Sequence, residues 1–159
     1  NEIICAYYFS MSNGYTEDSA SVFKESLSYT KSVESPWELN VKNNEKTVEI
    51  NKDYFCEKLN IDCNNLNIKD IKRNKTNHVE SIKINNKVYT GIEFRKLLSL
   101  RSTDFDIEVN KNILITTRGY GHDVGMSQYG ANELAKLGKT YDEIIKYYYN
   151  EVEIENLNV

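Results

Sequence analysis

The sequence has few of the residues that interrupt or cross-link a chain. It contains one proline and three cysteines, and no hydrophobic run approaches the roughly 18 residues that a membrane-spanning helix needs. The cysteines form no C-x-x-C pair, so a zinc or redox motif of that kind is excluded, and whether Cys56 and Cys63 pair stays open. Cys5 lies in a strand-like pattern, where we expect a small buried side chain. The net charge of −4 argues against nucleic acid as the main partner.

The composition fits a soluble protein with helices and strands. Its 159 residues, 40% of them hydrophobic and 28% charged, suit one domain or a core with one insertion. Hydrophobic periodicity and capping residues predict strands at 2–10, 37–41, 104–109, 113–117 and 152–157, two strands within 66–84, and helices at 16–23, 52–59, 92–100, 127–137 and from Thr140.

The motifs gather at the two ends of the chain. We therefore predict an α+β fold, in which a mixed core with a cleft carries an inserted, smaller α/β peripheral subdomain. The first part of the core is expected at 1–36, the insertion at 37–110, and the second part, with a glycine- and histidine-rich loop, at 111–159.

Residues 118–131 are the most informative stretch, because they hold four of the seven glycines together with His, Ser, Gln and two Tyr. Glycine allows a positive φ or a close backbone approach, so a loop that precedes a helix is expected here. The stretch lacks the lysine of a phosphate-binding loop, the third glycine of a dinucleotide fingerprint and the G-x-S-x-G pattern of a serine nucleophile. These three general site types are excluded.

Four stretches together resemble the stage II sporulation protein D family. Residues 118–131 are similar to its run G-x-G-H-G-V-G-M-S-Q-x-G-A, with Asp123 where the family usually has Gly. Asp tolerates a positive φ better than most residues, so we expect the turn to persist. Residues 10–17 are similar to S-x-S-x-G-x-T-E, 29–33 to Y-L-K-S-V, and 95–105 to R-x-x-L-x-L-R-S-T-x-F.

The resemblance implies a lytic transglycosylase, which cleaves cell-wall glycan strands to 1,6-anhydro ends during engulfment of the forespore. The family's general acid is a Glu in an A-E-M-P-like segment upstream of these motifs, and this chain has no such segment. The resemblance thus implies that the chain is the C-terminal part of a longer parent. It further implies that the chain carries no catalytic residue, cofactor or metal ligand of its own, so we expect the chain alone to be inactive.

The implied partners are peptidoglycan glycan strands, the upstream part of the same protein, a cell-wall amidase and a membrane scaffold protein. The implied location is extracytoplasmic, with the full-length parent anchored in the membrane and facing the space between mother cell and forespore.

The resemblance and the chemistry of the side chains together select two sets of site residues. The first set supports the active site: His122, Ser127, Gln128, Tyr129, Tyr29 and Lys31. The second set binds the substrate: Ser12, Gly14, Tyr15, Gly121, Gly125 and Arg101. For His122, an ordinary pKa of about 6.5 suits proton transfer or a hydrogen bond to sugar.

Several of these residues also have purely structural explanations. Ser127 can simply cap the helix that follows it, and residues 147–149 are expected to pack a core edge rather than to stack on sugar. Glu133 is the one nearby carboxylate that could replace the upstream acid, although an exposed Glu on an amphipathic helix is ordinary. Two other functions stay open: a non-catalytic wall-binding or amidase-enhancer module, and a purely structural fragment.

Overall fold

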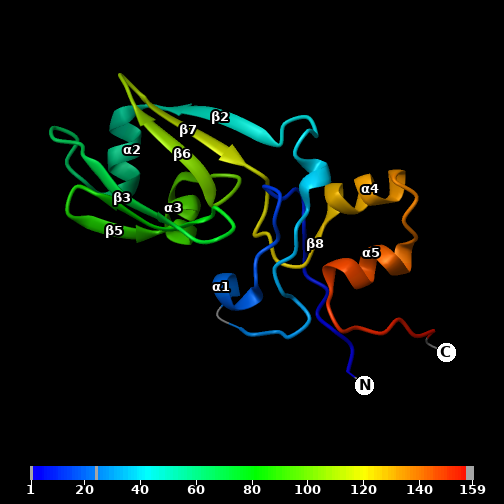
Figure 1. Ribbon diagram of the computed structural model, residues 1–159. Coiled ribbons are helices and arrows are strands. Elements are labelled where there is room, and N and C mark those ends of the chain that lie inside the picture. Colours follow the sequence, from blue (N-terminus) through cyan, green and yellow to red (C-terminus); the bar gives the residue numbers. More distant parts are fainter. Residues whose placement is uncertain (1, 24, 157–159) are drawn as a thin grey trace. The chain divides into compact units, whose positions relative to one another are not determined.

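The structure is a computed structural model that describes residues 2–23 and 25–156. The chain divides into two compact units. Unit 1 comprises residues 1–44 and 120–159, and unit 2 comprises residues 45–119. Figure 1 shows the two units, with labels on many of their helices and strands.

Unit 2 contains two three-stranded antiparallel sheets. The first has the order β2 (Glu45–Ile50), β7 (Ile113–Arg118) and β6 (Asp104–Val109). The second has the order β3 (Ile68–Arg73), β4 (Val79–Ile84) and β5 (Lys87–Thr90). In β7, the buried Ile113 and Ile115 alternate with more exposed residues, as expected for a strand with one face on a core.

Two capped helices complete unit 2. Asn51 accepts hydrogen bonds from the first turn of α2 (Lys52–Leu59), and Thr90 forms a capping box with Glu93 of α3 (Gly91–Leu98). The fully buried ring of Phe94 stacks on that of Phe105, with 4.9 Å between the ring centroids. The buried core therefore joins the helices to both sheets.

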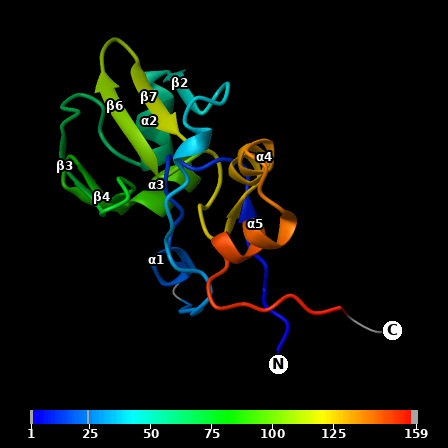
Figure 2. The ribbon, with the colours of Figure 1, turned by 45° about the vertical axis from the view of Figure 1, so that its right-hand side comes forward.

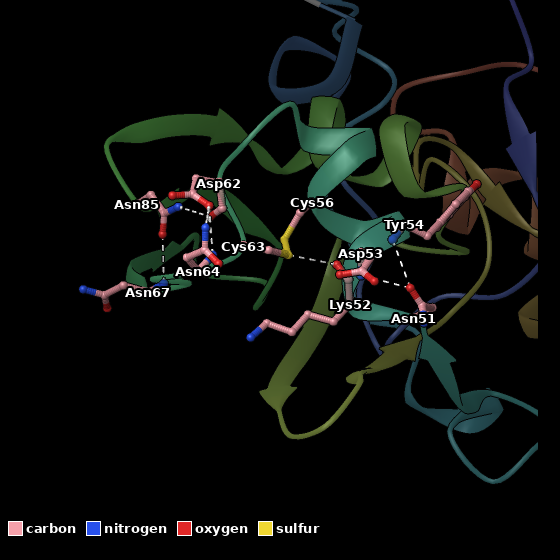
Figure 3. Close-up of a disulfide and its surroundings, with 10 residues drawn as sticks. All are labelled: Asn51, Lys52, Asp53, Tyr54, Cys56, Asp62, Cys63, Asn64, Asn67 and Asn85. Atoms are coloured by element: carbon pink, nitrogen blue, oxygen red, sulfur yellow. Dashed lines mark hydrogen bonds between the residues drawn. A yellow bond between two sulfur atoms is a disulfide. The ribbon is translucent and has the colours of Figure 1, made fainter.

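A disulfide links Cys56 of α2 to Cys63, with 5.7 Å between their Cα atoms (Figure 3). It closes the turn that leaves α2, beside the Asn51 cap. The sequence left this pairing open, and the structure forms it. Cys5, expected to be buried in a strand, is instead exposed and lies outside any strand.

Unit 1 is built from short elements. Two parallel strands, β1 (Tyr8–Phe9) and β8 (Met126–Ser127), pair Tyr8 with Met126 and Phe9 with Ser127. The helices are α1 (Ser19–Phe23), the 3-10 helix η1 (Pro36–Glu38), α4 (Gln128–Lys136) and α5 (Tyr141–Tyr148). α4 and α5 lie side by side in both views (Figures 1 and 2), around a core that includes Leu134, Ile144 and Tyr148.

Three predicted strands are wrong in whole or in part. Within 2–10, only Tyr8–Phe9 forms a strand, because β-forming residues need a partner and β8 is short. Residues 37–41 form no strand, since Pro36 fixes φ at the first position of η1 and the chain then turns. Residues 152–156 form no strand, and the predicted end at 157 lies outside the described residues.

Three strands were missed by the sequence patterns. β5 and β8 are short, and β2 is polar except where Val48 and Ile50 pack against the core. The mixture of helices and strands is confirmed, as are the helices near 52–59, 92–98 and 128–136. Within the described residues, no helix has the length and hydrophobicity to cross a membrane.

The units divide the chain at other positions than the predicted domain borders. Residues 113–118, assigned from the sequence to the second part of the core, hydrogen-bond to β2 and β6 inside unit 2. The description of 37–110 as an inserted peripheral subdomain stays a prediction.

Candidate functional site

The glycine-rich loop packs closely against the backbone at and just before β1. A Cβ on Gly125 would meet the carbonyl oxygen of Tyr7 at 2.0 Å, and one on Gly121 would meet Cβ of Phe9 at 2.6 Å. Both glycines also have a positive φ. The backbone geometry alone therefore requires glycine at both positions, and their predicted contact with substrate stays a prediction. Asp123 has a φ of 63°, so this Asp does adopt the turn expected of the family's glycine.

His122 is half-buried among aromatic rings. Its ring centroid lies 5.2 Å from that of Phe23 and 5.9 Å from that of Phe9. Nδ1 accepts a hydrogen bond of 3.1 Å from the backbone N–H of Val124. A neutral imidazole that accepts at Nδ1 carries its proton on Nε2, which makes Nε2 the hydrogen-bond donor.

Ser127 begins α4 as its N-cap. Its Oγ accepts a hydrogen bond of 3.1 Å from the N–H of Gly130, which confirms the predicted cap. The same hydroxyl donates a hydrogen bond of 2.5 Å to the carboxylate of Glu38. Ser127 is fully buried, whereas the next two residues, Gln128 and Tyr129, are exposed on the first turn of α4.

Glu38 is a functional candidate that the sequence patterns missed. It is fully buried, and its two carboxylate oxygens accept four hydrogen bonds. Oε1 accepts from the hydroxyls of Ser12 and Ser35, both at 2.6 Å. Oε2 accepts from the hydroxyl of Ser127 and from the backbone N–H of Ser12 at 3.0 Å. We call Glu38 and these three serines the Glu38 cluster.

A local signal for this cluster does exist. Ser35 and Glu38 have the S-x-x-E spacing of a capping box, with Pro36 at the first helical position. In the structure, the Ser35 hydroxyl does bond to the Glu38 carboxylate. The spacing could have predicted a helical turn here, but not the contacts with Ser12 and Ser127.

The Glu38 carboxylate lies at the N-terminus of α4. The backbone N–H groups there carry a partial positive charge, which stabilises an anion in place of a cationic partner. Gly130 makes this approach possible, since a Cβ at that position would meet the hydroxyl oxygens of Tyr148 and Ser35 at 2.1 and 2.6 Å and Oε1 of Glu38 at 2.8 Å. The glycine of the S-Q-x-G-A pattern thus makes room for the cluster.

Tyr148 extends the cluster to α5. Its hydroxyl shares a hydrogen bond of 2.8 Å with Ser35 and accepts one of 3.4 Å from the indole N–H of Trp37. Burial raises the pKa of Tyr148 to about 12, so the phenol stays neutral at physiological pH. Tyr148 and Tyr149 are buried, which confirms the predicted core packing for these two tyrosines, whereas Tyr147 is 36% exposed.

The remaining predicted residues of unit 1 surround these groups in different ways. Ser12 is fully buried in the Glu38 cluster, and its Oγ also accepts from the N–H of Gly14 at 3.1 Å. Tyr15 is 39% exposed and forms an isolated β-bridge with Glu34. Ser12 therefore supports the site from within, whereas Tyr15 has a surface that a ligand can reach.

Tyr29 and Lys31 contact different partners. The Tyr29 hydroxyl accepts from the backbone N–H of Cys5 at 3.1 Å, while the exposed Lys31 forms an ion pair of 3.3 Å with Asp18. Arg101 belongs to unit 2, where it follows α3. The functional roles predicted for all three stay predictions.

Glu133 lies on α4 and accepts a hydrogen bond of 2.6 Å from the ammonium of Lys136. A general acid must instead present a proton to its substrate, so this ion pair gives no support to Glu133 as the proton donor. Among the described residues, no group of three or more His, Cys, Asp and Glu side chains could hold a metal ion.

Comparison with known proteins gives closely related sequences. The chain is 41% identical over 157 residues to stage II sporulation protein D of Bacillus subtilis (strain 168). It is 40% identical over 157 residues to the protein of the same name from Bacillus amyloliquefaciens. Each match covers 97% of this chain and 46% of the relative. A shorter match, 54% identical over 35 residues, covers 22% of this chain and 5% of the amidase enhancer of Bacillus subtilis.

No family model matches the chain. The match to stage II sporulation protein D nevertheless extends over 97% of the chain. The chain spans about half the length of the curated relatives it matches. The chain belongs to the stage II sporulation protein D family.

Proposed function

We propose that this chain is the substrate-holding part of a peptidoglycan lytic transglycosylase that acts during spore engulfment. The observation that carries the proposal is the Glu38 cluster, which ties the N-cap of α4 to two other segments of the chain, at Ser12 and at residues 35–38. Gln128 and Tyr129 lie on this anchored turn and are exposed. A ligand site needs side chains that are held on a rigid element in this way.

The proposed chemistry needs one proton donor. A lytic transglycosylase protonates the glycosidic oxygen with a single Glu, which then acts as base while the 6-hydroxyl of the sugar closes a 1,6-anhydro ring. We propose that this Glu lies in the part of the relatives that the chain does not span. His122, Gln128 and Tyr129 hold and orient the glycan.

The disulfide supports an extracytoplasmic location, because structural disulfides persist in oxidising compartments. We propose that the longer parent is anchored in the membrane and faces the space between mother cell and forespore. A cell-wall amidase and a membrane scaffold protein are its proposed partners.

Substitution of His122 in the longer parent tests this function. We expect His122→Ala to lower the release of anhydro-ended fragments by roughly tenfold or more, the usual scale for a positioning or acid–base group. The melting temperature should stay near that of the parent protein. Lost stability with retained activity would make His122 structural.

The short match to an amidase enhancer supports a second candidate function, a non-catalytic wall-binding module. This function predicts that the longer parent binds glycan strands and raises the rate of a wall amidase without releasing anhydro-ended products. The product assay therefore separates the two candidates.

A further inference from the structure

Unit 1 has a pocket of about 370 Å³ beside the Glu38 cluster. This volume lies within the roughly 300–1,000 Å³ typical of small-molecule sites. One wall is formed by Trp37, Asn40, Val41 and Lys42, and the other wall is α4.

The α4 wall consists of the residues at helix positions 129, 132, 133 and 136. The spacing i, i+3, i+4, i+7 places them on one face of the helix. The opposite face carries the buried Gly130 and Leu134. α4 therefore packs one face in the core and lines the pocket with the other.

The side chain of Trp37, in the pocket wall, is held in place by contacts with α5. Trp37 donates from its indole N–H to Tyr148 and packs edge-to-face against Tyr147, with 5.4 Å between the ring centroids. Tyr129, on the other wall, is 43% exposed. A fixed indole and an accessible phenol offer ring faces on which a flat, partly apolar ligand can stack at little cost in conformational entropy.

The polar part of the pocket suits a ligand rich in hydroxyl and amide groups. The side-chain amide of Asn132 donates one hydrogen bond of 3.3 Å to Glu133, and it carries a second N–H donor and a carbonyl acceptor. Glu133 is already paired with Lys136, so its charge is locally balanced. Lys42 adds one positive charge to the lining. Stacking rings beside an amide match a pyranose ring with an acetamido group better than a purely apolar molecule.

We infer that this pocket is a saccharide subsite for an N-acetylated pyranose of a glycan chain. The inference rests on the proposed function and adds to it Trp37 and Asn132, which lie outside the glycine-rich loop. In this subsite, the ring of the sugar stacks on Trp37 and Tyr129, and its acetamido group or hydroxyls bond to Asn132.

The fluorescence of Trp37 tests the inference directly, because it is the single tryptophan of the chain. The chain is titrated with tetra-N-acetylchitotetraose, and with cellotetraose as a ligand that lacks acetamido groups. We expect the first to shift Trp37 emission to saturation and the second to bind more weakly. Tyr129→Ala and Asn132→Ala should each raise Kd by roughly three- to tenfold, as for the loss of one stacking ring or one hydrogen bond.

Tyr141→Ala is the matched control, since Tyr141 is 72% exposed on α5 and does not line the pocket. Its Kd should stay within about twofold of the unsubstituted chain. Asn132→Ala removes an exposed side chain, so it also serves if Tyr129→Ala fails to fold. An unchanged emission of the folded chain, or equal binding by the Asn132 variant, would overturn the inference. Equal binding of cellotetraose would overturn the assignment to an N-acetylated sugar.

Failure of this inference is distinguishable from failure of the proposed function. Anhydro-ended products from the longer parent without any response of Trp37 would overturn the saccharide subsite alone. A saturable response of Trp37 without such products would overturn the transglycosylase alone.

Discussion

Glu38 is fully buried although it carries a carboxylate and no lysine or arginine is hydrogen-bonded to it among the described contacts. Burying an unpaired charge is costly unless hydrogen bonds satisfy it. Three hydroxyls, one backbone N–H and the N-terminus of α4 do so here. The buried donors therefore need the carboxylate as their hydrogen-bond acceptor, and the carboxylate needs these donors to offset the cost of its burial.

Substitution of Glu38 should reveal this dependence. Glu38→Gln replaces one acceptor oxygen with an amide NH₂ group, which is a donor. The serine hydroxyls that donate to this oxygen in the original chain would then face another donor. We expect a loss of about 1–3 kcal/mol in the free energy of unfolding, and a larger loss for Glu38→Ala, measured by urea denaturation. Glu34→Gln is the matched control, because Glu34 is exposed, and should change stability by less than about 0.5 kcal/mol. If Glu38→Gln were as stable as the original chain, the carboxylate would not be needed.

Tyr148 gives a prediction for alkaline pH. Its folded-state pKa of about 12 lies above the unfolded value of 10.0, so between these values the folded chain holds a proton that the unfolded chain has lost. Stability from this group is complete below pH 10 and falls as pH rises from about 10 to about 12, by at most about 3 kcal/mol.

The free energy of unfolding is measured at pH 9 and at pH 11, for the original chain and for Tyr148→Phe, and the decline between the two pH values is compared. The variant lacks the titrating hydroxyl, so its decline should be smaller than that of the original chain. Identical declines for the two proteins would contradict a buried, neutral Tyr148.

At the scale of elements, helices were predicted well and short strands poorly. Helix starts carry local signals, such as the caps at Asn51, Thr90 and Ser127, and these signals lie within three residues of their partners. A strand depends on a partner far along the chain, as β1 depends on β8. The same reason hid the Glu38 cluster, whose partners Ser12 and Ser127 are 26 and 89 residues away in sequence.

Gly130 tests how closely α4 packs on the cluster. Alanine normally favours a helix over glycine by about 1 kcal/mol. Here the added Cβ would meet three polar oxygens at 2.1 to 2.8 Å. We therefore expect Gly130→Ala to destabilise the chain by about 1–3 kcal/mol in urea denaturation. Asn132→Ala, an exposed change on the same helix, should leave stability within about 0.5 kcal/mol. A stabilising Gly130→Ala would contradict the close approach.

At the scale of the whole molecule, the two units have separate cores, one around Phe94 and Phe105 in unit 2 and one around Leu134 and Tyr148 in unit 1. The sequence placed the glycine-rich loop and helix α4 correctly, since their motif is local. The predicted domain borders stay a prediction. The predicted site residues of 10–31 and 120–129 lie in unit 1, and Arg101 lies in unit 2.

The disulfide should act on unit 2 alone. Removing it through Cys56→Ala with Cys63→Ala should lower stability by about 2 kcal/mol, the loss expected for a short closed loop. Amide hydrogen exchange should become faster in α2 and its neighbours and stay unchanged in α4 and α5. Equal acceleration in both units would contradict their separate cores.

The central claim is that this chain holds the glycan while the proton donor lies in the remaining part of the parent. Mass spectrometry of the products released from purified glycan strands tests it most directly, with this chain alone and with the chain mixed with the segment encoded upstream. The account predicts anhydro-ended fragments from the mixture and none from the chain alone. Anhydro-ended fragments from this chain alone would contradict it and place the acid among the residues described here.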